Sequence, residues 1–283
     1  MSRKRLTKQL EQSTGPIVIV GAGNMGGAIA RGLAAIGHAR RVLLIDPQPL
    51  ASITDPLLSS GARIAQTSAA LDNTSPIAII LAVKPQLLPT IAPQYADASK
   101  SALTISVAAG TTIETLNRLL NSPPSLIRAM PNLPASIGKG MTAAFATPTT
   151  SNLYRDLAEE LLRSVGEFVW LDDESLLNAV TAVSGSGPAY VFHMVECLAK
   201  AAQKQGLPRD TAEILARKTV EGAGALLASV EKSPSELRKS VTSPGGTTEA
   251  ALQILMADAR LEKIIIDAVA AATLRGEALS KLS

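Results

Sequence analysis

The fold is decided by a stretch near the N-terminus that reads IVIVGAGNMGGAIARGL (residues 17–33). Its four opening apolar residues predict a buried strand, and a helical pattern starts at Met25. Between them stands a G-x-G-x-x-G pattern formed by Gly21, Gly23 and Gly26. In this context the first glycine permits a tight turn, the second leaves room for a pyrophosphate, and the third lets the helix pack closely. The stretch therefore predicts a dinucleotide site, and the alternative is a glycine-rich turn without a ligand.

The residues after this turn refine the expected ligand. Amides at the start of the helix, at Asn24 and Met25, are expected to face the phosphates. Asp46 follows the next predicted strand and lies about 20 residues after the last glycine, where a ribose-binding acid is expected. Its carboxylate would accept from the ribose 2′-OH and repel a 2′-phosphate, and Pro47 follows rather than Arg or Lys. Asp46 thus slightly favours NADH over NADPH, and the alternative is a strand-end Asp that starts a turn.

Further strand signals alternate with helical ones through the first half of the chain. They are continuous apolar runs without alternation, which is typical of strands buried on both faces of a parallel sheet. The predicted strands are 16–20, 41–45, 77–83, 104–108 and 126–130, with 141–146 and 168–171 as later candidates. This alternation predicts a doubly wound α/β domain.

Three of these strand ends carry candidate cofactor contacts, because ligands of doubly wound sheets bind beyond the carboxyl ends of the strands. Ala82, Val83 and Lys84 end the third strand. Lys84 could reach a ribose hydroxyl, and the alternative is a solvated Lys before a loop. Ala108 ends the fourth strand with a small side chain, as expected where a ribose or nicotinamide passes close. Asn132 follows the fifth strand and could orient either a carboxamide or a loop.

The character of the chain changes after about residue 173. Strand signals end, and long helical patterns rich in Ala and Leu cover 174–205, 209–230 and 258–282. We therefore expect a polar N-terminal extension (1–15), a dinucleotide-binding domain (16–173) and an all-α domain (174–283). Helix faces of this kind often pack against an identical partner, so a homodimer is expected.

One segment, SGSGPAY (residues 184–190), interrupts the first of these helical patterns. Gly and Pro lower helix stability, so a helix that contains them is expected to kink or to approach another backbone closely. The alternative is a plain joint between two helices. Ser186 in this segment is a candidate substrate contact.

A second segment, SPGGTT (residues 243–248), precedes a predicted helix over 250–256. Small residues with backbone N–H groups at a helix start can cradle a carboxylate, which makes Gly245 and Gly246 candidate substrate-binding residues. Thr247 or Thr248 is expected to double as the N-cap. Helix capping without any ligand is the alternative.

Composition excludes several classes of chemistry. The chain of 283 residues has one Cys, two His, three Phe, three Tyr and one Trp. These numbers exclude an internal disulfide, a thiolate zinc cluster and a three-His metal site, so no metal is expected. Scarce aromatics and a net charge of only +3 argue against nucleic acid. No apolar run reaches the roughly 18 residues of a membrane span. With a lone Cys and no secretory signal, the expected location is the cytoplasm.

Taken together, these motifs resemble those of the pyrroline-5-carboxylate reductases in order and spacing. The resemblance runs from about residue 17 to 282 and is carried by GAGNMGGAIARGL, AVKPQ, SVAAG, RAMPNLPASIGKGMT, VSGSGPAYVF and SPGGTTEAAL. It implies a Rossmann domain followed by an all-α dimerisation domain. It also implies a homodimer, with assembly of such dimers into a decamer left open.

The resemblance further implies a reaction and its site. The reaction is the reduction of (S)-1-pyrroline-5-carboxylate to L-proline by hydride transfer from NAD(P)H. In the family the substrate carboxylate lies on the backbone of the Gly-Gly-Thr-Thr loop, which makes Gly245, Gly246, Thr247 and Thr248 the substrate-binding residues here. A Thr hydroxyl bonds the ring nitrogen, which points to Thr248. Family members often complete this site across the dimer. A protonated imine already carries positive charge, so hydride transfer needs no general acid from a side chain, unlike ketone reduction.

The chain differs from many family members at three places. Residues 65–68 lack the Asn that approaches the adenosine, Asp46 stands where Ser, Asn or a basic residue is frequent, and Glu249 replaces an apolar residue after the Thr pair. Two other functions stay open. One is a 3-hydroxyacid-type dehydrogenase, for which the helical Lys200, Lys204 and Lys218 are available. The other is a catalytically silent dinucleotide-binding regulatory protein.

Overall fold

The computed structural model describes residues 15–72 and 74–280. Residues 1–14, which make up nearly all of the expected N-terminal extension, lie outside this range. The described residues fall into two compact units: one holds those up to Ser186 together with those from Ala272 onward, and the other holds Gly187–Ala271. The boundary expected near residue 173 stays a prediction.

The first unit contains one mixed sheet, whose eight strands stand among the described residues in the order β3-β2-β1-β4-β5-β6-β7-β8. The strands are β1 (Ile17–Val20), β2 (Val42–Ile45), β3 (Arg63–Ala65), β4 (Ala78–Leu81), β5 (Leu103–Ser106), β6 (Leu126–Met130), β7 (Gly140–Ala146) and β8 (Gly166–Trp170). The first six are parallel, β7 runs antiparallel to β6, and β8 is parallel to β7. The order of the first six reverses direction between β1 and β4, which confirms the Rossmann-type sheet.

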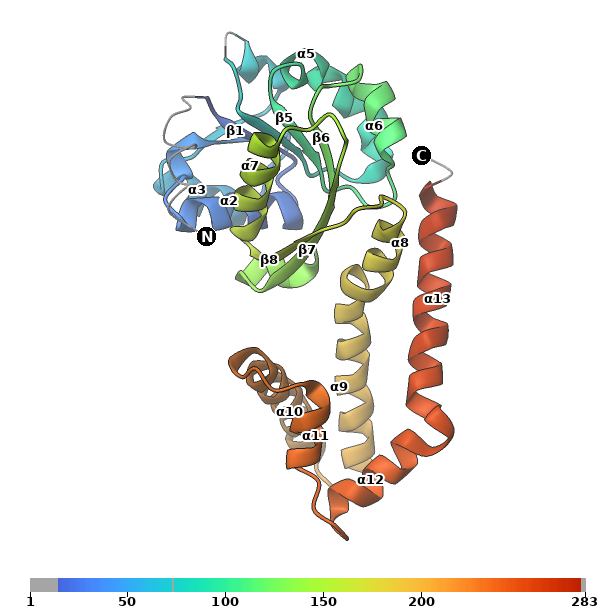
Figure 1. The fold of residues 1–283 in the computed structure, drawn as a ribbon. Helices are drawn as coiled ribbons and strands as arrows, with labels where there is room; N and C mark the ends of the chain where they lie inside the picture. Colours follow the sequence, from blue (N-terminus) through green and yellow to red (C-terminus); the bar gives the residue numbers. More distant parts are fainter. Residues whose placement is uncertain (1–14, 73, 281–283) are drawn as a thin grey trace. The chain divides into compact units, whose positions relative to one another are not determined.

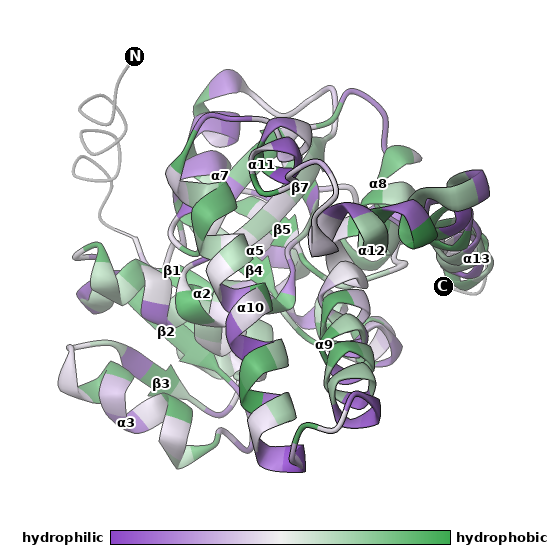
Figure 2. Ribbon diagram, turned by 90° about the horizontal axis from the view of Figure 1, so that it is seen from below, coloured by the Kyte–Doolittle hydropathy of each residue, from purple (hydrophilic) through white to green (hydrophobic). Residues whose placement is uncertain are grey.

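Helices cover both faces of this sheet (Figure 1). Successive strand residues point to opposite faces, so Ile17 and Ile19 belong to one buried cluster and Val18 and Val20 to the other. The first cluster contains residues of α2 (Asn24–Ala35), α3 (Ala51–Ser59) and α7 (Asn152–Arg163), and the second those of α4 (Leu88–Ile91) and α6 (Ile113–Leu120). The short α5 (Ala96–Ser99) follows the 3₁₀ turn that contains the buried Tyr95. Figure 2 shows the contrast between hydrophobic strands and helices of alternating hydropathy.

The second unit is entirely helical. It holds α9 (Gly187–Lys204), α10 (Arg209–Ser229), α11 (Pro234–Ser240), α12 (Thr247–Met256) and the first part of α13 (Arg260–Ser280). The last part of α13 belongs to the first unit, where Ser280 Oγ lies 3.4 Å from Asn178 Oδ1 of α8 (Leu176–Val180). No helix in the described ranges is long and apolar enough to cross a membrane.

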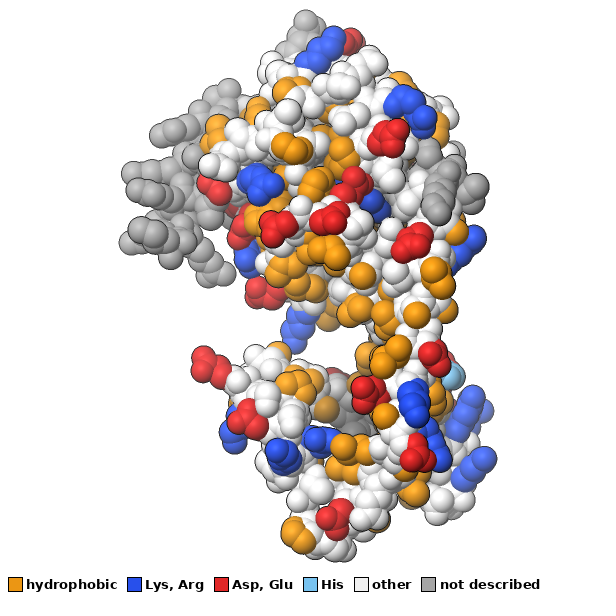
Figure 3. Space-filling model, turned by 45° about the vertical axis from the view of Figure 1, so that its right-hand side comes forward, with side chains coloured by type: hydrophobic (Ala, Val, Ile, Leu, Met, Phe, Trp, Pro, Cys, Tyr) orange, Lys and Arg blue, Asp and Glu red, His pale blue; other side chains and the backbone are white. Residues whose placement is uncertain are grey.

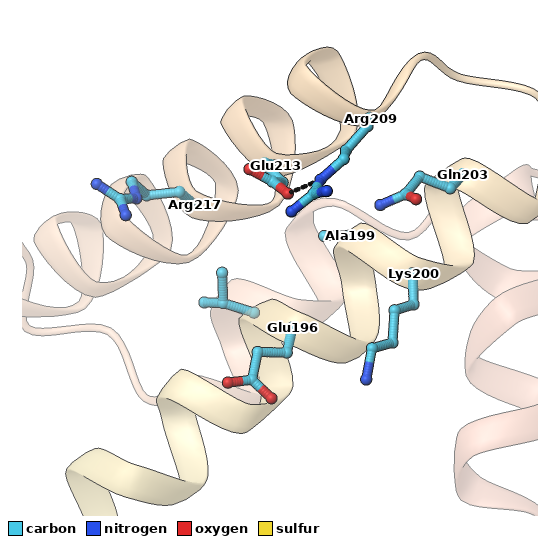
Figure 4. A pocket seen from close by; sticks show the side chains of 8 residues that line it. Glu196, Ala199, Lys200, Gln203, Arg209, Glu213 and Arg217 are labelled. Atoms are coloured by element: carbon cyan, nitrogen blue, oxygen red, sulfur yellow. Dashed lines mark hydrogen bonds and ion pairs between the residues drawn. The ribbon is translucent and has the colours of Figure 1, made fainter.

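Helices α9 and α10 pack together through small side chains. Ala199 on α9 and Ala212 and Ala216 on α10 are the buried hydrophobic residues among those described in this unit. A hollow of about 430 Å³ beside this contact is lined by five charged side chains together with Val195, Ala199 and Gln203. Arg209 Nε pairs with Glu213 Oε1 at 2.8 Å across one turn of α10 (Figure 4). Large apolar side chains are instead exposed along the unit, including Phe192, Ile214, Ile254, Ile264 and Ile266. The helical unit therefore has only a small core of its own.

Candidate active site

The glycine turn between β1 and α2 has the geometry that its sequence predicts. Gly21 has φ +101°, a conformation open to glycine, and its N–H donates to the Ile45 carbonyl at 2.8 Å. A Cβ on Gly26 would collide with the carbonyl oxygen of Gly21. Around the Cβ position of Gly23, by contrast, no described heavy atom lies within 4 Å. The first and last glycines are therefore required by the turn itself, whereas Gly23 leaves open space beside exposed backbone.

Asp46 connects the end of β2 to this turn. Its Oδ2 accepts from the Ala22 N–H at 2.7 Å, and its Oδ1 accepts from the Gln48 N–H at 2.8 Å. The carboxylate thereby holds the middle of the glycine turn and its own following turn. Each carboxylate oxygen keeps a second acceptor site, so this bracing does not prevent Asp46 from accepting a ribose hydroxyl.

A cavity of about 500 Å³ opens beside the turn, at the carboxyl ends of the strands. It is lined by Val20, Gly21, Ile45, Asp46, Pro47, Gln48, Gln66, Thr67, Ser68, Val83, Leu87, Ile91, Gln94 and Tyr95. Apolar walls with a few polar groups are typical of a nucleoside site. Neither Lys nor Arg is among the lining residues, and Asp46 is the only carboxylate there. Burial raises the pKa of the Tyr95 hydroxyl from its ordinary value to about 12.

The other strand-end residues divide between this cavity and its surroundings. Val83 lines it, and Ala82 lies against the glycine turn, its carbonyl oxygen being 2.7 Å from the Cβ position of Gly21. Ala108 is buried after β5. Lys84 is exposed at the start of the next turn and is not a lining residue. Asn24 and Met25 open α2, with Asn24 exposed and Met25 half-buried.

Asn132 serves as a connector after β6. Its Nδ2 donates to Ser184 Oγ at 3.1 Å, and its Oδ1 accepts from the Met141 N–H at 2.9 Å. These bonds orient local backbone, and a contact of Asn132 with a carboxamide stays a prediction. The side chain joins the end of β6 to the start of β7 and to the segment that follows α8.

That segment is the interruption predicted from SGSGPAY. Residues Thr181–Gly185 form a π-helical turn, in which the Ser186 N–H donates to the Thr181 carbonyl at 2.8 Å. The Cβ position of Gly185 is 2.6 Å from Met130 Cε, so only glycine fits there without displacing the methionine. The predicted interruption is confirmed as a π-helical turn, whereas the close contact is with a methionine side chain and not with another backbone. Turns of this type are frequent at functional sites.

The ion pair between Arg128 and Glu174 was not predicted from the sequence. Arg128, on β6, is 5% exposed, and its Nη1 donates to Glu174 Oε1 at 2.8 Å. The same oxygen accepts from the Ile113 N–H at 2.8 Å. The signal available in the sequence was an arginine within the apolar run LIRAM, since a buried charge requires a partner. Its partner is 46 residues away and could not be identified from spacing.

In the second unit, the Gly-Gly-Thr-Thr loop starts α12. Gly245 has φ +71°, and the Gly246 N–H donates to the Ser243 carbonyl at 3.0 Å, which closes a turn. The N-cap residue is Gly246, in extended conformation, so the expectation that Thr247 or Thr248 caps the helix was wrong. The helix begins directly after Gly246, so both threonines are its first residues and neither precedes it as a cap. Thr247 is exposed and Thr248 half-buried.

The Rossmann sheet, the glycine turn and the carboxylate after β2 define a dinucleotide-binding protein. Within that class, residues 16–110 match the family model "NADP oxidoreductase coenzyme F420-dependent" and residues 174–279 match "Pyrroline-5-carboxylate reductase dimerisation". A pyrroline-5-carboxylate reductase of Pseudomonas aeruginosa is 38% identical over 277 residues, which cover 95% of this chain and 98% of that protein. The chain belongs to the pyrroline-5-carboxylate reductase family.

Solved structures agree with this assignment. A pyrroline-5-carboxylate reductase from Coxiella burnetii superposes with a TM-score of 0.86 at 35% identity and covers 95% of this chain and 99% of that one. A Plasmodium falciparum pyrroline carboxylate reductase, solved with NADP bound, has a TM-score of 0.79 at 24% identity, covers 94% of this chain and 98% of that one, and shares the fold.

Proposed function

We propose that the chain reduces (S)-1-pyrroline-5-carboxylate to L-proline by hydride transfer from NAD(P)H to the imine carbon. The observation that carries this proposal is the pairing, in one chain of this family, of a glycine turn built for a dinucleotide with a second glycine loop built for a carboxylate. The first loop fits the dinucleotide because Gly23 leaves space where a pyrophosphate must approach the amides of α2. When bound, the reduced nicotinamide supplies the hydride.

The chain's own residues bind and orient the imine. The amides that start α12 point out of the helix without acceptors in the first turn, and they carry partial positive charge that suits a carboxylate. The Thr248 hydroxyl is proposed to bond the ring nitrogen. The imine nitrogen loses its positive charge when the carbon accepts hydride, so no side chain need deliver a proton in that step. This explains how a chain with two His and one Cys can perform the reaction.

Thr248→Val tests this role, since valine keeps the side-chain shape and removes the hydroxyl. We expect kcat/KM for the imine to fall about tenfold, the value of one hydrogen bond to a charged group. Thr219→Val, at an exposed position of α10 outside the loop, is the matched control. Equal kinetic constants for wild type and Thr248→Val would remove the residue from the site. Turnover of hydroxyacids alone would replace the imine reaction by the hydroxyacid dehydrogenase alternative.

NADH is proposed as the preferred form of the cofactor. A 2′-phosphate would enter a cavity whose lining offers the Asp46 carboxylate and no Lys or Arg, so it would meet repulsion without compensation. Comparing kcat/KM for NADH and NADPH tests this preference, and Asp46→Ser should shift the ratio toward NADPH. A wild-type preference for NADPH would contradict the proposal.

A homodimer is proposed from the helical unit, with the two proposed halves of the site contributed across it. The support is the set of large apolar side chains that α9, α10, α12 and α13 expose, among them Phe192, Ile214, Ile254 and Ile264. Figure 3 shows hydrophobic side chains at the surface of this unit, and contiguous exposed apolar surface is typical of a protein interface. Analytical ultracentrifugation separates monomer, dimer and the decamer that the family resemblance suggested. A cytoplasmic location stays a prediction from the single, unpaired Cys197.

A further inference from the structure

Glu249, which follows the Thr pair, folds its side chain back onto the Gly-Gly-Thr-Thr loop. Its Oε2 accepts from the Gly245 N–H at 2.8 Å, and the residue is half-buried. Gly245 is the loop residue with positive φ, at +71°. The hydrogen bond therefore fixes the peptide whose conformation is least restricted by sterics. Gly246, the N-cap residue, cannot stabilise the loop in this way because it has no side chain.

The contact between Glu249 and Gly245 leaves three amides at the start of α12 available to a ligand. The Gly245 N–H is bound by Glu249, and the Gly246 N–H donates to the Ser243 carbonyl at 3.0 Å. The helical ladder begins only with the Ala250 N–H, which donates to the Gly246 carbonyl at 3.2 Å. The intervening amides, those of Thr247, Thr248 and Glu249, have no acceptor within the helix. They are the donors that can receive a carboxylate.

Resting on the proposed function, we propose that Glu249 is a positioning residue for the substrate carboxylate. By holding Gly245 it sets the direction of the Thr247 and Thr248 amides before the substrate arrives. Such preorganisation lowers the entropic cost of binding. Glu249 thereby determines affinity for the imine without contacting it and without a part in hydride transfer.

The charge of Glu249 is compatible with an anionic substrate nearby. A cavity of about 480 Å³ beside the loop is lined by Arg238 and Lys239 of α11 as well as by Glu249. The lining of this cavity therefore carries two positively charged side chains and one carboxylate, and its net charge is positive. Loss of the Glu249 contact is therefore expected to weaken carboxylate binding through the loop conformation rather than to relieve repulsion.

Steady-state kinetics with the imine and NADH test the proposal. For Glu249→Ala we expect KM for the imine to rise about tenfold, with KM for NADH and kcat within about twofold of wild type. Glu249→Gln should restore KM to near the wild-type value, because its amide oxygen can accept from Gly245. Glu249→Asp, whose shorter side chain cannot reach, should behave like Glu249→Ala and serves as the second variant if the alanine protein folds poorly.

The matched control is Glu236, which makes the same kind of contact at a different helix. Its Oε2 accepts from the Ser233 N–H at 2.8 Å at the start of α11. Glu236→Ala should leave KM for the imine unchanged. An unchanged or lowered KM in Glu249→Ala, or a fall in kcat at constant KM, would overturn the positioning role. Failure of the wild type to reduce the imine would instead refute the proposed function, and the inference with it.

Discussion

The two glycine loops of this protein are built alike but supported differently. In each, a carboxylate accepts a hydrogen bond from an amide of the loop: Asp46 from Ala22 at 2.7 Å and Glu249 from Gly245 at 2.8 Å. Asp46 reaches across from a neighbouring strand, 24 residues away, whereas Glu249 is four residues away on the helix that the loop begins. The first loop is fixed by the tertiary structure, while the second is fixed by its own first turn.

The difference also concerns what surrounds the glycines. The contrast holds for the glycine with positive φ in each loop: a Cβ on Gly21 would lie 2.7 Å from the Ala82 carbonyl oxygen, whereas no described heavy atom lies within 4 Å of the Cβ position of Gly245. It does not extend to Gly23, which is open, or to Gly246, whose Cβ position is 3.0 Å from the Ser243 carbonyl oxygen. The dinucleotide loop is thus complete within one compact unit. The carboxylate loop depends on local contacts and on the proposed partner subunit.

Gly26→Ala should have the largest effect, because its Cβ would collide with the backbone of Gly21 and press on the Ala82 side chain. We expect the free energy of unfolding to fall by about 3 kcal/mol, the upper part of the range for overpacked cores. Urea denaturation followed by circular dichroism measures this loss. A variant as stable as wild type would show that the turn adapts more easily than the contrast implies.

Asp46→Ala should cost about 2 kcal/mol, since it leaves the Ala22 amide without its charged acceptor. The same measurement on Glu249→Ala should show a smaller loss, because that loop is more exposed and water can replace the carboxylate. A larger loss for Glu249→Ala than for Asp46→Ala would reverse the contrast between the two loops.

Gly23→Ala should separate binding from folding. No described atom stands near its Cβ position, so the free energy of unfolding should change by less than about 0.5 kcal/mol, as at ordinary surface positions. Affinity for NADH should fall about tenfold because the methyl group occupies the space proposed for the pyrophosphate. Quenching of NADH fluorescence measures the dissociation constant, and unchanged affinity would remove Gly23 from the site.

Glu236→Ala should have the smallest effect, and one that depends on pH. Hydrogen bonds from Ser233 hold the pKa of the Glu236 carboxyl below its ordinary value. A lowered pKa in the folded state means that the contact stabilises at neutral pH and that this contribution is lost as pH falls through the folded-state pKa. Thermal melts of wild type and variant should therefore differ slightly at pH 7 and converge in acid. A constant difference would argue against the capping contact.

The sequence was sufficient for the parts of the fold that rest on local pattern. The strand 126–130 was predicted with the bounds of β6, and the helices after residue 173 were recognised from their composition. The edge strand Arg63–Ala65 was missed because it has three residues, of which the first is exposed and the others half-buried. Helix α3 was missed as well, and its internal Pro56 obscures the helical pattern.

The reversal of β7 could not be predicted either. An apolar run such as 141–146 indicates a buried strand but carries no information on its direction. Here the short connection from β6, through a 3₁₀ turn that ends at Gly138 with φ +70°, returns the chain antiparallel. Direction follows from the connection rather than from the strand.

For the candidate site, the sequence indicated positions better than roles. Gly21, Gly23, Gly26 and Asp46 were found because spacing along the chain mirrors their proximity. For Asn132, the sequence left open whether it orients a carboxamide or a loop, and its bonds to Ser184 and Met141 became visible only once β6, β7 and the π-helical turn were placed. Side chains that connect elements far apart in sequence leave no local pattern to read.

The brace formed by Asp46 has a consequence for protein engineering. The carboxylate proposed to select the cofactor is also the one that holds the Ala22 amide, so changing the cofactor by replacing this residue would be linked to a loss of stability. A useful replacement must keep an oxygen within reach of Ala22 while giving up the negative charge. Asn is the first candidate. A replacement without such an oxygen would need compensating, stabilising mutations elsewhere in the first unit.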